Sequence, residues 1–373
     1  MRYKLKDIFD LQMGKTPSRN NMEYWNTNDY KWISIADLTK TGKYISETKE
    51  YLSESAVGDS GIKVIPANTV VMSFKLSIGK TAITAENMYS NEAIMAFHDK
   101  HIVEILPEYI YYMFKYKNWD EGSNKAVMGK TLNKATLSEV EIEICSITEQ
   151  RKIVSVLDKM SSVLEKREDE LSALDDLIKA RFVELFGNPD INENNWDTYK
   201  MEQLCEVGSS KRIYQNEQSM TGIPFLRISD LVNRMDTGSK DSDLFIPEER
   251  FEELKKQGLV PESGDILLTA RGTLGRCYII QDNDEFYFQD GMITWLSKYD
   301  VKITPLYISY LFEMPGFRKQ IDSLQAGSTV AYLSISMTKK LDIMVPPLEL
   351  QNEFSDFVHQ VDKSKVAVQK ALE

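Results

Sequence analysis

The chain has 373 residues, of which 42% are hydrophobic and 27% are charged, and its formal net charge is -12. This length and composition predict a globular protein with two or more domains. No apolar run approaches about 18 residues, so we expect neither a transmembrane helix nor a secretory leader. The negative charge excludes a protein that binds nucleic acid over its whole surface, but a local basic cluster can still bind DNA.

The acidic excess lies mostly in the second half of the chain. Residues 1–147 carry 18 Lys and Arg against 19 Asp and Glu, whereas residues 188–373 carry 20 against 29. Three cysteines, Cys145, Cys205 and Cys277, show no pairing pattern. Scattered cysteines favour a reducing compartment, so we expect a cytoplasmic protein.

The dominant pattern is one long internal repeat, in which residues 3–171 return as residues 199–372. A repeat of this length predicts two copies of a whole domain. Polar and apolar residues alternate at residues 32–38 and 225–231, which predicts a strand in each copy. Further on, each copy predicts a buried strand followed by a cationic loop that contains glycine. These strands and loops are expected at residues 70–72 and 75–80, and again at residues 266–268 and 271–276.

Each copy then predicts a helix that begins at a proline and a final strand with alternating apolar residues. These elements are expected at Pro107 and Pro305, and at residues 140–144 and 341–345.

A segment rich in Leu, Lys and Glu ends each copy, at residues 147–188 and 348–373. Its heptad spacing predicts long helices, and we expect the two to pack as an antiparallel coiled coil. The second is shorter, so we expect a truncated C-terminus. The predicted seam, which also serves for contact with partners, consists of Ile153, Leu157, Met160, Leu164, Leu171, Leu174, Ile178, Leu185, Phe354, Val358, Val361 and Val368.

Two consequences of this pairing are expected. Lys365 would lie in an apolar seam, where snorkelling or an acidic residue on the partner helix would relieve its charge. Residues beyond the shorter helix would need the surface of another protein, and these are Leu174, Leu177, Ile178 and Phe182.

These elements predict an α+β protein with two similar mixed α/β domains, separated by two long helices and related by a pseudo-twofold axis. The expected boundaries are residues 1–146, 147–188, 189–347 and 348–373.

Motifs for catalysis are missing from the sequence. The run Gly129-Lys130-Thr131 lacks the upstream glycine of a phosphate-binding loop. His98 and His101 could hold a metal, but an ordinary histidine pair at the end of a strand is favoured. We therefore expect no catalytic residue and no metal site.

The ordered duplication of several short motifs resembles the specificity (S, or HsdS) subunits of type I restriction-modification systems, over essentially the whole chain. These motifs lie at residues 32–38, 77–80, 148–153, 182–187, 225–231 and 348–351. The resemblance implies that each domain is a target-recognition domain for one half of an interrupted double-stranded DNA site. It also implies that the helices set the spacer and dock two methyltransferase subunits, with an endonuclease and translocase subunit joining them. S-adenosylmethionine, ATP and Mg²⁺ would then belong to the partners, and this chain would be neither an enzyme nor a cofactor carrier.

Base reading requires cationic, amide or hydroxyl side chains on exposed loops. The candidates in the two copies are Ser34, Asp37, Lys75, Ser77, Lys80 and Lys130, and Arg212, Arg227, Asp230, Arg271, Thr273 and Arg276. Because the two sets differ, the site is expected to be asymmetric. A first helix of about 58 Å would separate the readers by somewhat under two turns of duplex.

Two alternatives remain open from the sequence. The chain could be a reader module detached from a fused restriction-modification enzyme. It could also be a coiled-coil scaffold that binds proteins and not DNA.

Overall fold

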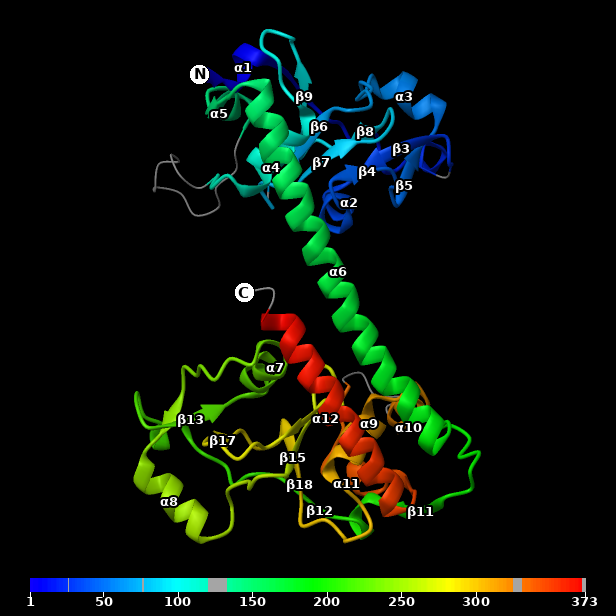
Figure 1. Cartoon of the computed structure of the whole chain (residues 1–373), viewed down its shortest axis with the longest axis vertical. Coiled ribbons are helices and arrows are strands. Elements are labelled where there is room, and N and C mark those ends of the chain that lie inside the picture. The colour runs from blue at the N-terminus through cyan, green and yellow to red at the C-terminus, as the bar shows by residue number, and fades with distance from the viewer. Residues whose placement is uncertain (26, 76, 120–132, 325–330, 371–373) are drawn as a thin grey trace. The chain divides into compact units, whose positions relative to one another are not determined.

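The structure is a computed structural model that describes residues 1–25, 27–75, 77–119, 133–324 and 331–370. It divides into two compact units, unit 1 (Met1–Glu165) and unit 2 (Lys166–Glu373), which Figure 1 shows with their elements labelled. Helix α6 (Ile147–Phe186) begins in unit 1 and ends in unit 2. In the described part of the chain, every helix is too short or too polar to cross a membrane.

A sheet of five described strands, in the order β2-β9-β6-β7-β4, forms the framework of unit 1. Val70 and Met72 belong to one buried apolar cluster and Val71 belongs to another. Because neighbouring residues of a strand point to opposite faces, both faces of the sheet are covered, which explains the continuous apolar run. The strands are β2 (Phe9–Met13), β4 (Tyr44–Ile45), β6 (Val70–Ser73), β7 (Thr81–Thr84) and β9 (Ile94–Asp99).

Two smaller sheets complete the described strands of unit 1, with the orders β5-β3-β8 and β1-β10. Their strands are β1 (Arg2–Lys4), β3 (Tyr30–Ile33), β5 (Glu50–Leu52), β8 (Tyr89–Ser90) and β10 (Glu141–Glu143). The helices of this unit, besides the start of α6, are α1 (Leu5–Ile8), η1 (Met22–Tyr24), α2 (Ile35–Lys40), α3 (Glu54–Ser60), α4 (Pro107–Tyr116) and α5 (Lys134–Ser138).

Among the described residues, unit 2 repeats most of this order, without a counterpart of β4 and with an additional helix at Pro315–Leu324. Its described strands form sheets with the orders β12-β18-β15-β16, β14-β13-β17 and β11-β19. The strands are β11 (Asp197–Lys200), β12 (Glu206–Gly208), β13 (Ile223–Leu226), β14 (Phe245–Ile246), β15 (Ile266–Thr269), β16 (Cys277–Ile279), β17 (Tyr287–Phe288), β18 (Ile293–Ser297) and β19 (Asp342–Val345). The helices are η2 (Met201–Gln203), η3 (Gln215–Glu217), α7 (Ile228–Thr237), α8 (Glu248–Lys256), α9 (Pro305–Glu313), α10 (Pro315–Leu324), α11 (Ile335–Lys339) and α12 (Leu348–Lys370).

The predicted repeat and fold class are confirmed. The pairing of β3 with β8 is parallel, and so is the pairing of β13 with β17. The helices predicted at Pro107 and Pro305 are α4 and α9, each with proline in its first turn. The strands predicted at residues 32–38 and 225–231 are wrong in their second half, where α2 and α7 begin.

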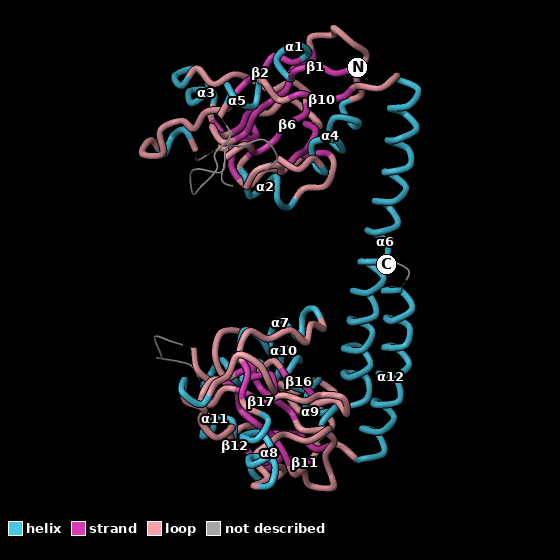
Figure 2. Tube along the Cα trace, turned by 90° about the vertical axis from the view of Figure 1, so that its left-hand side faces the viewer, coloured by secondary structure: helices cyan, strands magenta, loops and turns pink. Residues whose placement is uncertain are grey.

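In unit 2, helix α12 lies alongside the end of α6 (Figure 2). The pair is antiparallel, because Arg181 contacts Glu353 at 2.5 Å while Asp175, earlier in α6, contacts Lys365, later in α12, at 2.6 Å. Aromatic rings fill the space beneath them, with the ring of Phe354 5.5 Å from that of Phe182. The acidic partner predicted for Lys365 is thus Asp175.

The structure reverses which part of α6 is left without a helical partner. Of the four residues that were expected to need another protein, Ile178 and Phe182 are buried in the core of unit 2, and Leu174 packs against that core. Leu177 is exposed, as expected. Ile153, Met160 and Leu164 were expected in the seam, but they are 40%, 56% and 45% exposed. The remaining seam residues that are buried are Phe354, Val358, Val361 and Val368, and Leu174 and Leu185 pack against the same core.

Candidate nucleic-acid interface

Two hairpin loops, β6–β7 in unit 1 and β15–β16 in unit 2, have the same construction. The fully buried Ser73 hydroxyl donates to the Ser77 carbonyl and accepts from the Lys80 N–H at 3.0 Å. The equally buried Thr269 hydroxyl donates to the Thr273 carbonyl at 2.5 Å and accepts from the Arg276 N–H at 2.9 Å. One internal hydroxyl therefore holds each loop in shape, and the loop presents its cations from a fixed backbone.

In unit 1, the hairpin loop exposes Ser77 and Lys80, while Lys75 is half-buried with its ammonium 5.4 Å from the Phe74 ring. Lys75 also lies near Glu92. The Thr16 hydroxyl donates to Glu92 and holds the pKa of its carboxyl below the ordinary range, and the charge of Lys75 acts in the same direction. The loops after β2, β6 and β8 therefore meet on one side of unit 1. Lys130 lies outside the described residues.

In unit 2, the candidate arginines have defined partners. Arg276 contacts Asp236 at 2.6 Å, and the Arg271 guanidinium lies 4.9 Å from the Tyr332 ring centroid. Arg212 contacts Asp290 through Nε at 2.8 Å, and its side chain is 63% exposed. In the part of the chain that the structure describes, both terminal nitrogens of Arg212 stay without a hydrogen bond, so they are available as a fork for guanine. Thr273 is exposed on the hairpin loop.

Four candidates occupy the starts of helices α2 and α7 and have a structural role there. Ser34 and Asp37 form a capping box, in which the Ser34 N–H donates to Asp37 at 2.8 Å and the Asp37 N–H donates to Ser34 at 3.3 Å. At the start of α7, Arg227 and Asp230 form only one of these two bonds, in which the Arg227 N–H donates to the Asp230 carboxylate at 2.9 Å. The Arg227 guanidinium binds the same carboxylate. Capping satisfies N–H groups at the end of a helix, so these residues shape the backbone in the free protein.

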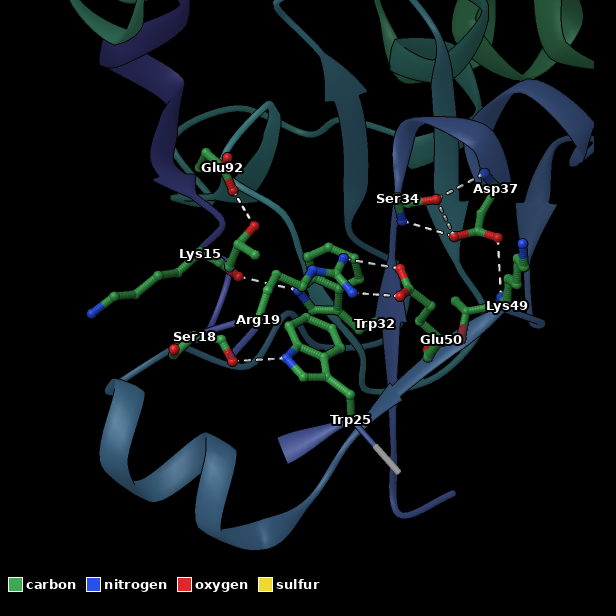
Figure 3. Close-up of polar contacts among 12 residues, drawn as sticks. Lys15, Ser18, Arg19, Trp25, Trp32, Ser34, Asp37, Lys49, Glu50 and Glu92 are labelled. Carbon is green, nitrogen blue, oxygen red and sulfur yellow. Dashed lines mark hydrogen bonds and ion pairs between the residues drawn. The ribbon is translucent and has the colours of Figure 1, made fainter. Parts of the chain in front are cut away.

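A brace of four side chains in unit 1 was not found from the sequence (Figure 3). The Arg19 guanidinium stacks on Trp25 at 3.7 Å and binds Glu50 through two nitrogens, at 2.5 and 3.0 Å. Trp32 lies 4.9 Å from Arg19 and donates its indole N–H to the Lys15 carbonyl. The Trp25 indole N–H donates to the Ser18 carbonyl, so the brace fixes the backbone of residues 15–19 beside Glu92.

The two histidines singled out from the sequence have ordinary contacts. His98 lies 3.1 Å from the Gln12 side chain, and burial lowers its pKa. His101 contacts Asp99 at 3.2 Å on the surface. Within the described ranges, no group of three or more His, Cys, Asp or Glu side chains has a geometry suited to a metal ion.

The comparison with known families agrees with this geometry. The sequence model of one protein family, the type I restriction modification DNA specificity domain, matches residues 1–173 and again residues 193–373. The chain belongs to this family. The resemblance drawn from the repeated motifs is confirmed, and the chain is a specificity subunit of the type I restriction-modification family, whose members are DNA-recognition proteins and are generally non-catalytic.

Relatives and solved structures extend the match over both copies. The chain is 26% identical over 393 residues to the MjaIX specificity subunit of Methanocaldococcus jannaschii, covering 99% of this chain and 88% of that one. It is 29% identical over 156 residues to the EcoR124I/EcoR124II specificity subunit of Escherichia coli, covering 40% and 38%. The S subunit of M. genitalium has the same fold, with a TM-score of 0.54 at 15% identity, covering 100% and 91%. A chain from a structural study of the assembly of a type I system aligns with a TM-score of 0.58 at 14% identity. The alignment covers 100% of this chain and 92% of that chain.

Proposed function

We propose that this specificity subunit reads a two-part double-stranded DNA site, with unit 1 on one half and unit 2 on the other. The observation that carries the proposal is the shared construction of the two hairpin loops, which place different side chains at matched positions. Lys75, Ser77 and Lys80 stand in unit 1 where Arg271, Thr273 and Arg276 stand in unit 2. Two loops with the same backbone but different side chains would read different bases, and an asymmetric site requires this.

Arg212 is our leading candidate for a base contact, because its exposed terminal nitrogens can bind the O6 and N7 of guanine together. Lys80 is the leading candidate in unit 1, since it is exposed on the fixed loop. Four residues at the starts of α2 and α7 keep a proposed role in DNA binding, as supports of the surface that faces the DNA. These are Ser34, Asp37, Arg227 and Asp230.

The helices have two proposed roles: to set the spacer between the half-sites and to dock two methyltransferase subunits. The second role is supported by an apolar stripe on α6, which we define as Ile153, Val156, Met160, Val163 and Leu164. Each of these side chains is at least 40% exposed. A stripe of this kind favours coverage by another protein.

We propose the boundaries 1–146 and 189–347 for the two target-recognition domains, and 147–188 and 348–373 for the helices. Methyl transfer and ATP-driven cleavage, with S-adenosylmethionine, ATP and Mg²⁺, are assigned to the methyltransferase and endonuclease subunits. We also propose a cytoplasmic location, which the three scattered cysteines favour.

The test is a map of methylated bases in cells that express the methyltransferase subunit with and without this chain. We expect methylation of one interrupted asymmetric sequence only when the chain is present. Methylation that is independent of the chain, or DNA binding without sequence preference in the complete complex, would favour the scaffold alternative.

A further inference from the structure

Among the described residues, two groups of buried or half-buried polar contacts attach helix α6 to unit 1. The first is Gln150, which is fully buried. Its side chain accepts from the Leu106 N–H at 2.9 Å and donates to the Glu104 and Cys145 carbonyls at 2.9 and 3.0 Å. These three bonds fix where the helix begins.

The second attachment is a group that we call the clamp, which consists of Lys43, Tyr112 and Asp158. Asp158 lies on α6, eight residues after Gln150. Its carboxylate accepts from the Lys43 ammonium at 2.5 Å and from the Tyr112 hydroxyl. Lys43 follows α2 and Tyr112 belongs to α4, so the clamp ties α6 to two separate elements of unit 1.

The protonation states suit the clamp at neutral pH. Burial alone would raise the pKa of Asp158, but hydrogen bonds from Lys43 and Tyr112 outweigh it and hold the pKa below its ordinary value. Burial, with the bond to Asp158, raises the pKa of Tyr112 to about 12, so its hydroxyl remains a donor. The clamp is thus one carboxylate with two fixed donors.

The other end of α6 is held differently. Phe182 and Phe186 are fully buried in the aromatic core of unit 2. In the clamp, the side chains of Lys43 and Asp158 are 22% and 40% exposed. Apart from the clamp and Gln150, only partly buried side chains such as Val154 and Leu157 join the described part of α6 to the core of unit 1. The attachment to unit 1 is therefore the one that can yield.

A small movement at the clamp becomes large along the helix. At 1.5 Å per residue, Asp158 lies about 12 Å from Gln150 and Phe186 lies about 54 Å from it. If α6 pivots at Gln150, a shift of about 1 Å at Asp158 becomes about 4.5 Å at Phe186. One base pair of duplex occupies about 3.4 Å. The displacement that a slack clamp would allow at the far end of α6 is thus comparable in size to one base-pair step.

We propose that Lys43 and Asp158 are positioning residues that restrict this subunit to one spacer length between its half-sites, without touching DNA. This inference rests on the proposed function. The length of the helix selects an approximate spacer, and the clamp rejects neighbouring lengths by fixing the direction in which α6 leaves unit 1.

The test compares methylated-base maps for complexes of the methyltransferase subunit with the wild-type chain, K43A, D158A and the double variant. We expect methylation at sites with a spacer one base pair longer or shorter to rise at least about fivefold in each single variant, with both half-site sequences unchanged. The double variant should show no further rise, because either change already opens the clamp. The exchange variant K43E/D158K, which restores the ion pair in reverse, should return these sites toward the wild-type level.

The matched control is K31A, which removes another ion-paired lysine of unit 1. Lys31 is 23% exposed and pairs with Glu47 and Glu86, away from α6. Its spacer distribution should equal that of the wild type.

Thermal melting followed by circular dichroism verifies that each variant is folded. Single variants with the wild-type spacer distribution would overturn the role of the clamp, and so would equal changes in K31A. A wild-type chain that directs no two-part pattern would overturn the proposed function itself.

Discussion

Gln150 and Gln351 make the same three hydrogen bonds in the two units. Gln351 accepts from the Thr304 N–H at 2.9 Å and donates to the Lys302 and Pro346 carbonyls at 2.9 and 2.8 Å, as Gln150 does with its own neighbours. Each glutamine is at most 1% exposed. One amide side chain at the start of each helix satisfies backbone groups of two segments, the loop before α4 or α9 and the residues just before the helix itself, so each helix is joined to its domain by the same device.

Replacing either glutamine by alanine is expected to be strongly destabilising. Gln150→Ala would leave one N–H and two carbonyl groups without partners in a buried place, which costs about 2 to 4 kcal/mol in free energy of unfolding. Urea denaturation measures this loss. The control is Gln360→Ala on the exposed side of α12, which should change stability by less than about 0.5 kcal/mol. Equal effects of the two substitutions would contradict the anchoring role.

The brace around Arg19 predicts a difference between arginine and lysine. Arg19→Ala should lower the free energy of unfolding by about 1 to 2 kcal/mol, because stacking on Trp25 and the two-point contact with Glu50 are both lost. Arg19→Lys should recover less than half of this, since an ammonium offers neither a flat face nor a fork. Tryptophan fluorescence during urea denaturation reports the change directly.

The control for the brace is Arg2→Ala, which removes an exposed arginine from the same unit. It should leave both stability and tryptophan fluorescence near the wild-type values. If Arg19→Lys proved as stable as the wild type, a simple charge contact would explain Arg19 and the stacked brace would be refuted.

The pair Arg227 and Asp230 predicts a dependence of stability on pH. Burial alone would raise the pKa of Asp230, but the hydrogen bonds from Arg227 outweigh it and hold the pKa below its ordinary value. A depressed folded-state pKa means that the carboxylate contributes stability above its ordinary pKa and loses it as the pH falls through the folded value.

Asp230→Asn should therefore be less stable than the wild type at neutral pH, and the gap should shrink below about pH 4. Urea denaturation at a series of pH values measures the gap. Asp243→Asn is the control, because the Asp243 side chain is 94% exposed and its carboxylate lies 3.9 Å from the Arg227 guanidinium. That distance is too long for a hydrogen bond. A gap that stayed constant into acid would count against the charged pairing of Asp230.

The apolar stripe on α6 predicts a selective loss of assembly. Leu164→Asp should reduce copurification of the methyltransferase subunit at least about tenfold, because a buried unpaired carboxylate is costly at an interface. The chain alone should keep its melting temperature, since Leu164 is 45% exposed. Val366→Asp is the matched control, as Val366 is 47% exposed on α12 and outside the stripe. Equal copurification of both variants would remove the stripe as a docking surface.

Much of the fold could be predicted because its signals are local and occur twice. The apolar run at Val70 and the prolines at Pro107 and Pro305 each describe one element, and the second copy repeats the evidence. The error at Ser34 arose where two local signals compete. Alternation favoured a strand, but a Ser with an Asp three residues later is also a capping box, and the box determines the backbone there.

The candidate site was harder to predict because it depends on contacts between distant residues. Arg19 meets Glu50 because Trp32 and Glu50 are opposite each other in the pairing of β3 and β5, and no sequence spacing contains that register. The partner of Ile178 was also misjudged, because heptad spacing identifies a seam but does not say which part of it the shorter helix covers. Two tryptophans close to an arginine were the available signal for the brace.

The most direct test of the account is a methylated-base map for two variants, Lys80→Ala in unit 1 and Arg212→Ala in unit 2, each in complex with the methyltransferase subunit. We expect each variant to relax the base preference at one half of the site, by about 5- to 150-fold at one base pair, and to leave the other half intact. If both variants altered the same half, or if neither altered any base preference while the wild type directed methylation, the assignment of one half-site to each unit would be contradicted.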